Sequence, residues 1–399
     1  MSKNQPTEVK PAIETFAKIK VVGVGGSGGA AVNRMIDSHI RGIEFVAVNT
    51  DAQDLHHNSA TTKIHIGKTT TRGLGAGMDP DVGRKAAEEN QDEIHDLLKG
   101  SDMVFITCGL GGGTGTGAAP VIAEIAKDVG ALTVAVVTKP FSFEGAQRLS
   151  IAEAGHGELS ERVDTIITIP NDRLLQIIDK KTSLLESFAI VDDVLRQGVQ
   201  GIAELITVPG LINVDFADVK AIMENAGTAL MGIGRATGEN RAVESAKAAI
   251  DSPLLELSID GAQGILFTVT GGDKLSMFEV NEAAKIITSS ADPNAKVIFG
   301  SVIDESLGDE VKITVIATGF GKGSNRPVMK KIAHTSPMAK NEDEPMSSFR
   351  SAATRSMDES PDKPKKKIES NFTPPPTVDD KTKEEEELEI PAFIRKKML

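Results

Sequence analysis

Two glycine-rich segments constrain the fold of this chain more than any other feature, because each follows a predicted strand and opens a predicted helix. The first, at 23–29, reads GVGGSGG and ends the apolar stretch 18–24. The second, at 109–117, holds six glycines in nine residues and follows the stretch 103–107. Glycines let the backbone approach a phosphate, and a helix N-terminus supplies free N–H groups. Together they predict a phosphate-binding crevice at the carboxyl edge of a parallel sheet.

Strand and helix patterns alternate along residues 18–320, which predicts an α/β fold with a parallel sheet covered on both faces. The predicted strands are 18–24, 44–48, 103–107, 132–138, 165–169, 264–270, 296–301 and 311–318. The predicted helices are 30–37, 183–205, 215–225, 241–250 and 274–290. The helix 183–205 keeps apolar residues three or four apart for six turns and stops before Pro209-Gly210.

These patterns divide the chain into six predicted segments. They are a flexible segment 1–16, a nucleotide-binding domain 17–182, a central helix 183–208, a second, smaller α/β domain 209–320, a disordered linker 321–386 and a partner-binding peptide 387–399. The linker is predicted because residues 321–399 hold only two of the 38 glycines but nine of the 18 prolines, with no hydrophobic period. Four bulky apolar residues in 388–394 favour a docking peptide, and the alternative is a terminal stretch that is apolar by accident.

Composition excludes several classes of protein. The net charge of −13 argues against nucleic acid as the main partner, because neutralising phosphates needs a basic surface. Cys108 is the single cysteine, which excludes an internal disulfide and a cysteine zinc cage. The longest apolar runs, such as 131–137, are too short to span a bilayer, and 1–16 has no apolar signal-peptide core. These features predict a soluble, cytoplasmic protein. We expect His56 and His57 at the surface and Cys108 packed.

The first glycine segment alone leaves a dinucleotide site open. It satisfies G-x-G-x-x-G, and Asp51 ends the next predicted strand, where such a fold keeps its ribose-binding acid. A nicotinamide-dependent dehydrogenase is therefore one alternative. A second, richer glycine segment favours a mononucleotide with a long polyphosphate. A P-loop is excluded, because Thr62 stands where the motif that would end at Lys68-Thr69 requires glycine.

The letters GGGTGTG in the second segment are the signature of the tubulin/FtsZ superfamily, and residues 17–320 resemble the FtsZ family of bacterial cell-division GTPases. Residues 390–395, IPAFIR, are similar to the tail peptide of that family. The resemblance implies a GTPase with GTP as substrate and Mg²⁺ beside it, which polymerises head to tail into a ring at the division site. It also implies that 388–395 binds division proteins and membrane tethers such as FtsA and ZipA, without membrane insertion.

The resemblance implies a set of nucleotide contacts. They are Gly25, Gly26, Ser27, Gly28, Gly29, Ala30, Gly75, Ala76, Gly77, Gly111, Gly112, Gly113, Thr114, Gly115, Thr116, Gly117, Glu144, Arg148, Phe188 and Asp192. Phe188 and Asp192 share a helix face, so one ring could stack on guanine while the carboxylate accepts its two N–H groups. Glu144 is assigned to the ribose and Arg148 to the nucleotide. The alternative for that pair is an i,i+4 ion pair at a helix start.

Ala30 departs from the family pattern, which has asparagine there. We expect weaker nucleotide binding, and a divergent paralogue or a GTP-binding passive copolymer is a further alternative.

A third chemical feature is the acidic segment 210–218, which matches the G-x-x-N-x-D-x-x-D loop of the family through Asn213, Asp215 and Asp218. The alternative is a helix N-cap followed by an acidic first turn. A six-turn helix, about 30 Å long, separates these acids from the nucleotide end. They are therefore predicted to reach the nucleotide of the next subunit, in a heterologous contact that does not close.

Overall fold

The computed structural model describes residues 17–175, 182–208, 210–253, 255 and 258–320. The predicted N-terminal segment, linker and tail peptide lie outside these residues. Ten described strands form one sheet in the order β3-β2-β1-β4-β5-β6-β7-β10-β8-β9. They are β1 (Ile19–Val24), β2 (Ile43–Asn49), β3 (Thr62–His65), β4 (Met103–Gly109), β5 (Leu132–Lys139), β6 (Thr165–Pro170), β7 (Gly227–Ala236), β8 (Gly264–Gly271), β9 (Lys296–Ile303) and β10 (Val311–Thr318).

The helices follow the predicted alternation. They are α1 (Gly25–Asp37), α2 (Ala52–His57), α3 (Pro80–Glu89), α4 (Gln91–Leu98), α5 (Thr114–Asp128), η1 (Ser142–Glu144), α6 (Ala146–Arg162), α7 (Asn171–Leu174), α8 (Leu184–Thr207), α9 (Phe216–Met223), α10 (Arg241–Ile250), α11 (Met277–Ser289) and η2 (Glu305–Leu307). Among the described residues, none of these helices combines the length and apolar character needed to cross a membrane.

The sheet is parallel from β3 to β7, as predicted for the nucleotide-binding domain. The second α/β region continues the same sheet but is mixed, because β10 runs antiparallel to both β7 and β8. Strand β7 was not predicted, since its glycines hide the strand pattern. Gly232 and Gly234 are needed there because a Cβ at either would overlap the backbone of α10.

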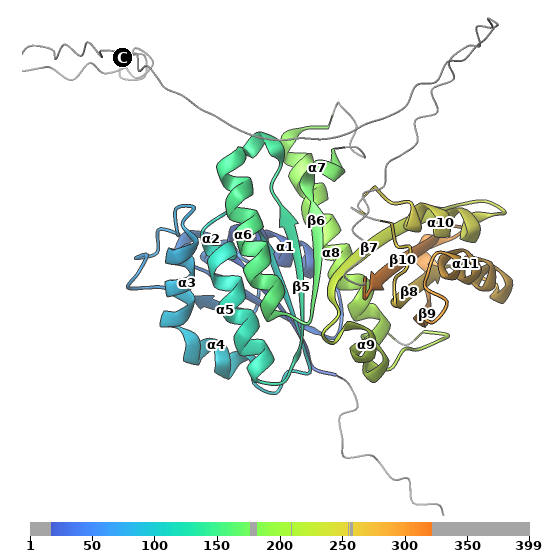
Figure 1. Cartoon of the computed structure of the whole chain (residues 1–399), viewed down its shortest axis with the longest axis horizontal. Coiled ribbons are helices and arrows are strands. Elements are labelled where there is room, and N and C mark those ends of the chain that lie inside the picture. Colours follow the sequence, from blue (N-terminus) through green and yellow to red (C-terminus); the bar gives the residue numbers. More distant parts are fainter. Residues whose placement is uncertain (1–16, 176–181, 209, 254, 256–257, 321–399) are drawn as a thin grey trace, which may run out of the picture. The chain divides into compact units, whose positions relative to one another are not determined.

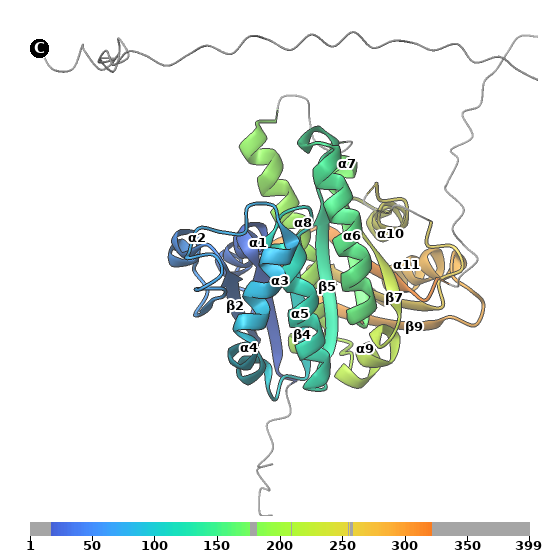
Figure 2. The same ribbon diagram turned by 60° about the vertical axis from the view of Figure 1, so that its left-hand side comes forward.

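Helices cover both faces of the parallel strands, which confirms the predicted layering (Figures 1 and 2). One core packs α1, α8 and α9 against the sheet, and the other packs α3, α4, α5 and α6. Successive residues of β1 alternate between them, with Val21 in the first core and Val22 in the second. A third core fills the space between α10, α11 and the strands β8 and β10.

The central helix α8 forms as predicted. Ser183 caps it, since its hydroxyl accepts from the Glu186 N–H at 3.2 Å while the Glu186 carboxylate accepts from the Ser183 N–H at 2.8 Å. Its apolar face is buried, and Gly201 lies close to the β10 side chain Thr314. At 1.5 Å per residue, its 24 residues separate its two ends by about 36 Å.

Candidate nucleotide-binding site

The two glycine segments lie side by side because β1 and β4 are neighbours in the sheet. The strand order reverses between them, which is the switch point where open α/β sheets bind ligands. The Ser27 hydroxyl ties the segments together by accepting a hydrogen bond from the Gly109 N–H at 2.9 Å. A Cβ added at Gly28 would overlap the Thr107 carbonyl, so only glycine allows this close approach. The predicted convergence of both segments on one crevice is therefore observed.

The helix N-termini at this edge favour an anion. No side chain caps α1 or α5, so the N–H groups of their first turns are open to a ligand. Among the described α-helices, only α1, α5 and α6 lack an acidic residue in the first turn. All three border the same cavity. Uncapped N-termini with no acidic residue in the first turn provide the positive potential that phosphates require.

A cavity of about 300 Å³ opens at this edge and brings together residues from six segments of the chain. It is lined by Val24, Gly25, Gly26, Ser27, Gly109, Leu110, Gly112, Gly113, Thr114, Gly115, Thr138, Pro140, Glu144, Arg148, Asn171, Phe188, Val191 and Asp192. Eleven of the twenty predicted nucleotide contacts therefore lie on its wall. They are Gly25, Gly26, Ser27, Gly112, Gly113, Thr114, Gly115, Glu144, Arg148, Phe188 and Asp192.

The other nine predicted contacts lie off the cavity wall. Those nine are Gly28, Gly29, Ala30, Gly75, Ala76, Gly77, Gly111, Thr116 and Gly117. The Gly111 N–H is already used, because it donates to the buried Thr116 hydroxyl at 3.0 Å. Gly117 is needed for packing, since a Cβ there would overlap the Pro80 carbonyl of α3. A nucleotide contact at these nine positions stays a prediction.

The third glycine cluster adjoins the second segment. Ala76 is buried, and a Cβ added at Gly113 would come within 2.7 Å of the Ala76 Cβ. The loop is held on its other side by a bridge between Leu74 and Asp51. Gly75 and Gly77 both have positive φ and open space where a Cβ would stand, so their backbone conformation is what requires glycine.

The predicted purine-binding pair lies near the N-terminal end of α8. Phe188 is 41% exposed and meets the buried Phe141 edge to face at 5.8 Å, which leaves part of its ring free for stacking. Burial raises the pKa of Asp192 to about 6, against the attraction of Arg34, which lowers it. A desolvated carboxylate gains from two N–H donors placed side by side, as guanine offers.

Glu144 and Arg148 form the i,i+4 ion pair that was the alternative interpretation, with 2.8 Å between Arg148 Nη1 and Glu144 Oε2. The other Glu144 oxygen accepts from the Phe141 N–H at 2.8 Å, which fixes the carboxylate. Both residues also line the cavity. Among the described residues, the buried Arg148 Nε has no hydrogen-bond partner. The pair is thus held in place while part of the guanidinium is free for a ligand.

Asn171 is a cavity residue that sequence reasoning missed. It is 6% exposed, and its Oδ1 atom has no hydrogen-bond partner among the described residues. A buried amide oxygen left unpaired needs a donor. Its position in the sequence could have indicated this role. Asn171 lies two residues after the predicted strand 165–169, at the sheet edge where the glycine segments gather.

Asp51 does not support the dinucleotide alternative. Its carboxylate caps α2 by accepting from the Gln53 N–H at 2.9 Å and from the Asp54 N–H at 3.2 Å. It does not line the cavity. The residue that a dinucleotide fold would use for the ribose is therefore engaged in capping the start of a helix.

The acidic segment lies past the opposite end of α8. Asn213, Asp215 and Asp218 are exposed, and none of them lines the cavity. Asp215 caps α9 by accepting from the Ala217 N–H at 3.4 Å, and Asn213 Oδ1 accepts from the Gly210 N–H at 2.6 Å. The N-cap alternative is thus observed for Asp215. It leaves the Asp218 carboxylate and one Asp215 oxygen facing solvent.

The remaining predictions concern metals and reactive groups. His56 and His57 are exposed, and Cys108 is buried, as predicted. Burial raises the pKa of the Cys108 thiol to about 12. Within the described ranges, no group of three or more histidine, cysteine or acidic side chains is placed to hold a metal. Mg²⁺ that is bound through the phosphates of a nucleotide needs few protein ligands.

Comparisons with known proteins agree with this geometry. Residues 18–179 match the family model "Tubulin/FtsZ family, GTPase domain", and 227–321 match "FtsZ family, C-terminal domain". An empty FtsZ dimer from M. jannaschii is 50% identical, with a TM-score of 0.74 over 76% of this chain and 89% of that one.

Two more distant structures share the fold. CetZ1 from Haloferax volcanii, a GDP-bound monomer, is 21% identical, with a TM-score of 0.66 over 76% of this chain and 95% of its own. CetZ2 from the same organism, a GTPγS-bound protofilament, is 22% identical, with a TM-score of 0.64 over 76% of this chain and 94% of its own. The two matched domains and the 50% identity lead to one conclusion: this chain is a GTPase of the FtsZ family.

Proposed function

We propose that this chain assembles head to tail into filaments at the division site and hydrolyses GTP at the contact between successive subunits. The observation that carries the proposal is the separation of the two halves of the reaction centre. The cavity contains Phe188 and Asp192 near one end of α8, and the acids lie past its other end. Since about 36 Å of helix lies between its ends, one subunit's acids reach only another subunit's nucleotide.

Exposed apolar side chains support a head-to-tail contact. Among the described residues, all the large exposed ones except Val297 fall into two groups. The rim patch consists of Leu74, Met78, Phe143, Leu149, Leu175, Leu185 and Phe188, each within four residues of a cavity-lining or predicted nucleotide-binding residue. The distal patch consists of Leu211, Met277 and Phe278, and Val297 lies near the other end of β9. Two different apolar surfaces on one chain suit a heterologous contact that repeats without closing.

Charge supports the same pairing. The loop 67–78 beside the cavity exposes Lys68 and Arg72 and contains no acidic residue. The segment 210–218 exposes Asp215 and Asp218 and contains no basic residue. Opposite charges on the two surfaces favour this orientation of docking over the alternatives.

Nucleotide binding follows from the groups around the cavity. The uncapped N-termini of α1 and α5 hold the phosphates. The Asp192 carboxylate accepts from the guanine N–H groups, the Phe188 ring stacks on the base, and Asn171 Oδ1 accepts a further donor. Glu144 is placed for the ribose hydroxyls, and Arg148 for the nucleotide.

Hydrolysis uses the solvent-facing acids of the next subunit. Asp215 and Asp218 orient a water molecule and accept its proton as it attacks the γ-phosphate, while Asn213 holds the segment in shape through the Gly210 N–H. Mg²⁺ bound with the triphosphate would share the developing negative charge. Products are GDP and phosphate.

The tail completes the proposal. Residues 388–395 bind division proteins and membrane tethers such as FtsA and ZipA, which would hold the filament near the inner face of the membrane. These residues lie outside the described part of the chain, so the sequence alone supports this step.

The test is the dependence of turnover on protein concentration. Phosphate release and pelleting are measured in parallel, with GTP and with GDP, across a dilution series. We expect turnover per molecule to rise steeply above a threshold concentration and pelleting only with GTP. Turnover per molecule that stays constant on dilution would overturn hydrolysis at the subunit contact.

A further inference from the structure

The start of α11 carries an unusual surface. Met277 and Phe278, its first two residues, are each 72% exposed. They follow β8, whose last residue Gly271 pairs with Ile303 of β9. Near the same end of β9, Ser301 pairs with the segment that holds Leu211. The apolar pair and the acidic segment therefore gather at one end of these strands.

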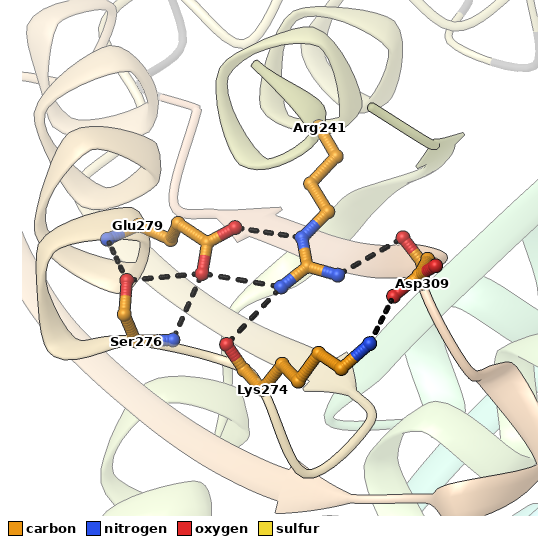
Figure 3. Close-up of polar contacts among 5 residues, drawn as sticks. All are labelled: Arg241, Lys274, Ser276, Glu279 and Asp309. Atoms are coloured by element: carbon orange, nitrogen blue, oxygen red, sulfur yellow. Dashed lines mark hydrogen bonds and ion pairs between the residues drawn. The ribbon is translucent and has the colours of Figure 1, made fainter. Parts of the chain in front are cut away.

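Arg241 makes polar contacts with the residues around the start of α11 (Figure 3). Its side chain is only 9% exposed, and it reaches from α10 to the start of α11. Its Nε donates to one Glu279 oxygen at 2.6 Å, and its Nη2 donates to the other at 3.3 Å. The same guanidinium donates to the backbone carbonyls of Asp309 at 3.0 Å and Lys274 at 3.3 Å. One side chain thus joins a helix start and two loops.

Glu279 connects Arg241 to the backbone on both sides of Met277 and Phe278. Its carboxylate accepts from the Ser276 N–H at 2.8 Å, and the Ser276 hydroxyl accepts from the Glu279 N–H at 3.2 Å. Met277 and Phe278 lie between these two bonded residues, so their backbone is held from both sides. Arg241 therefore orders a segment whose apolar side chains face solvent.

We propose that Arg241 is a positioning residue that holds Met277 and Phe278 as a preformed contact for the rim patch of a second copy of this chain. The inference rests on the proposed head-to-tail assembly. A second copy is the occupant because Leu211 of the distal patch belongs to the acidic segment, and the rim patch offers apolar side chains near the exposed Lys68 and Arg72. Ordering the contact in the monomer lowers the entropy lost on association.

The side-chain chemistry explains why arginine is used. Four acceptors in different directions suit a planar guanidinium, and a lysine ammonium cannot bridge them with the same geometry. Replacement by methionine keeps much of the volume and leaves the bonds between Ser276 and Glu279 in place. The helix start then survives, but its attachment to α10 and to the loop at Asp309 is lost.

The first experiment measures the critical concentration for GTP-dependent pelleting of the full chain. Arg241→Met is expected to raise it roughly tenfold, and Arg241→Lys by less. Lys274→Met is the matched control, because it removes only the exposed ion pair with Asp309 at 3.2 Å. GTP affinity, measured below the critical concentration, is expected to be the same in all four proteins, since the cavity contains none of these residues.

A second readout follows the order of α11 directly. The chain has no tryptophan and no tyrosine, so Phe278→Trp introduces a single reporter. In unassembled protein, Arg241→Met is expected to lower its fluorescence anisotropy, and Lys274→Met to leave it unchanged. If Arg241→Met fails to fold, Arg241→Lys in the same background decides the question.

The outcomes separate the two proposals. If the parent chain never pellets with GTP, the head-to-tail assembly fails and the positioning role fails with it. If the parent pellets but the Arg241 variants have its critical concentration and its reporter anisotropy, only the positioning role is overturned. A higher critical concentration with lower anisotropy and unchanged GTP affinity supports it.

Discussion

The nucleotide cavity and the Arg241 cluster contain the same kinds of polar group, but these differ in whether they have hydrogen-bond partners. In the cavity, buried polar atoms of Asn171 and Arg148 have no partner among the described residues, and burial raises the pKa of Asp192 to about 6. In the cluster, Arg241 makes four hydrogen bonds. Hydrogen bonds from Arg241 hold the pKa of Glu279 down at about 2.

The difference separates a binding site from a structural one. Buried polar groups in folded proteins are normally paired, so a cavity that keeps several unpaired groups has acceptors and donors available for a ligand. A cluster whose groups satisfy one another has none to offer and instead fixes the chain around it. The predictions below test this division, in order of decreasing effect.

The largest effect is expected for the acids of segment 210–218, which belong to neither the cavity nor the Arg241 cluster. Asp218→Asn should lower GTP turnover by roughly 10²–10⁴-fold, because a carboxylate that accepts a proton from water is lost. GTP affinity should not change, since Asp218 lies off the cavity wall. Glu224→Gln, at the other end of α9, is the control for loss of an exposed charge. Equal turnover in both variants would remove Asp218 from the mechanism.

The next effect is expected at Asp192. Asp192→Asn should weaken GTP binding roughly 100-fold and reduce the preference for GTP over ATP, because the amide cannot accept both guanine N–H groups. Calorimetry with both nucleotides measures this. Binding of GTP to the parent should weaken as pH falls through about 6, where Asp192 takes up a proton. The pH dependence should be absent in Asp192→Asn.

Asp192→Asn should weaken GTP binding but should raise the stability of the nucleotide-free protein. Its pKa is raised on folding, so its favourable contribution is complete below about pH 3.8 and is lost as pH rises through about 6. Nucleotide-free Asp192→Asn should therefore melt about 2 °C higher than the parent at pH 7. A lower melting temperature would show that the carboxylate is not held against a desolvation penalty.

A smaller effect is expected at Ala30, which is exposed in α1 just beyond the cavity wall. Ala30→Asn should strengthen GTP binding about fivefold, because it restores one polar contact. Ala30→Ser is a useful comparison, since its shorter side chain has less reach. No gain in either variant would mean that the alanine has no bearing on nucleotide affinity.

The smallest effect is expected when the pH is lowered from 7 to 5 and the order of the Arg241 cluster is followed. The pKa of Glu279 is lowered from 4.5 to about 2, so the stability it contributes is complete above about pH 4.5 and is lost as pH falls toward 2. Between pH 7 and pH 5, the Phe278→Trp anisotropy should stay constant while GTP affinity falls. A change in both signals over this range would contradict the contrast between the two regions.

Much of the fold was predictable because its signals are local. The predicted strands and helices recur in the structure with shifts of a few residues at their ends, and the helix predicted over 183–205 is observed as α8. Two of the exceptions have a physical cause. Strand β7 was missed because Gly232 and Gly234 serve contact with α10 rather than the strand pattern, and α1 begins at Gly25 because its first turn is built from glycines.

The sequence by itself determined the phosphate-binding edge, since glycines between a strand and a helix carry that information within a few residues. It also placed the acids beyond a long helix. Only the tertiary structure decided which groups stay unpaired, such as Asn171, and which are satisfied, such as Arg241 and Asp51. Pairing depends on residues far apart in the chain, as with Arg241 and Glu279. Burial and partners are properties of the packed molecule, which no local pattern encodes.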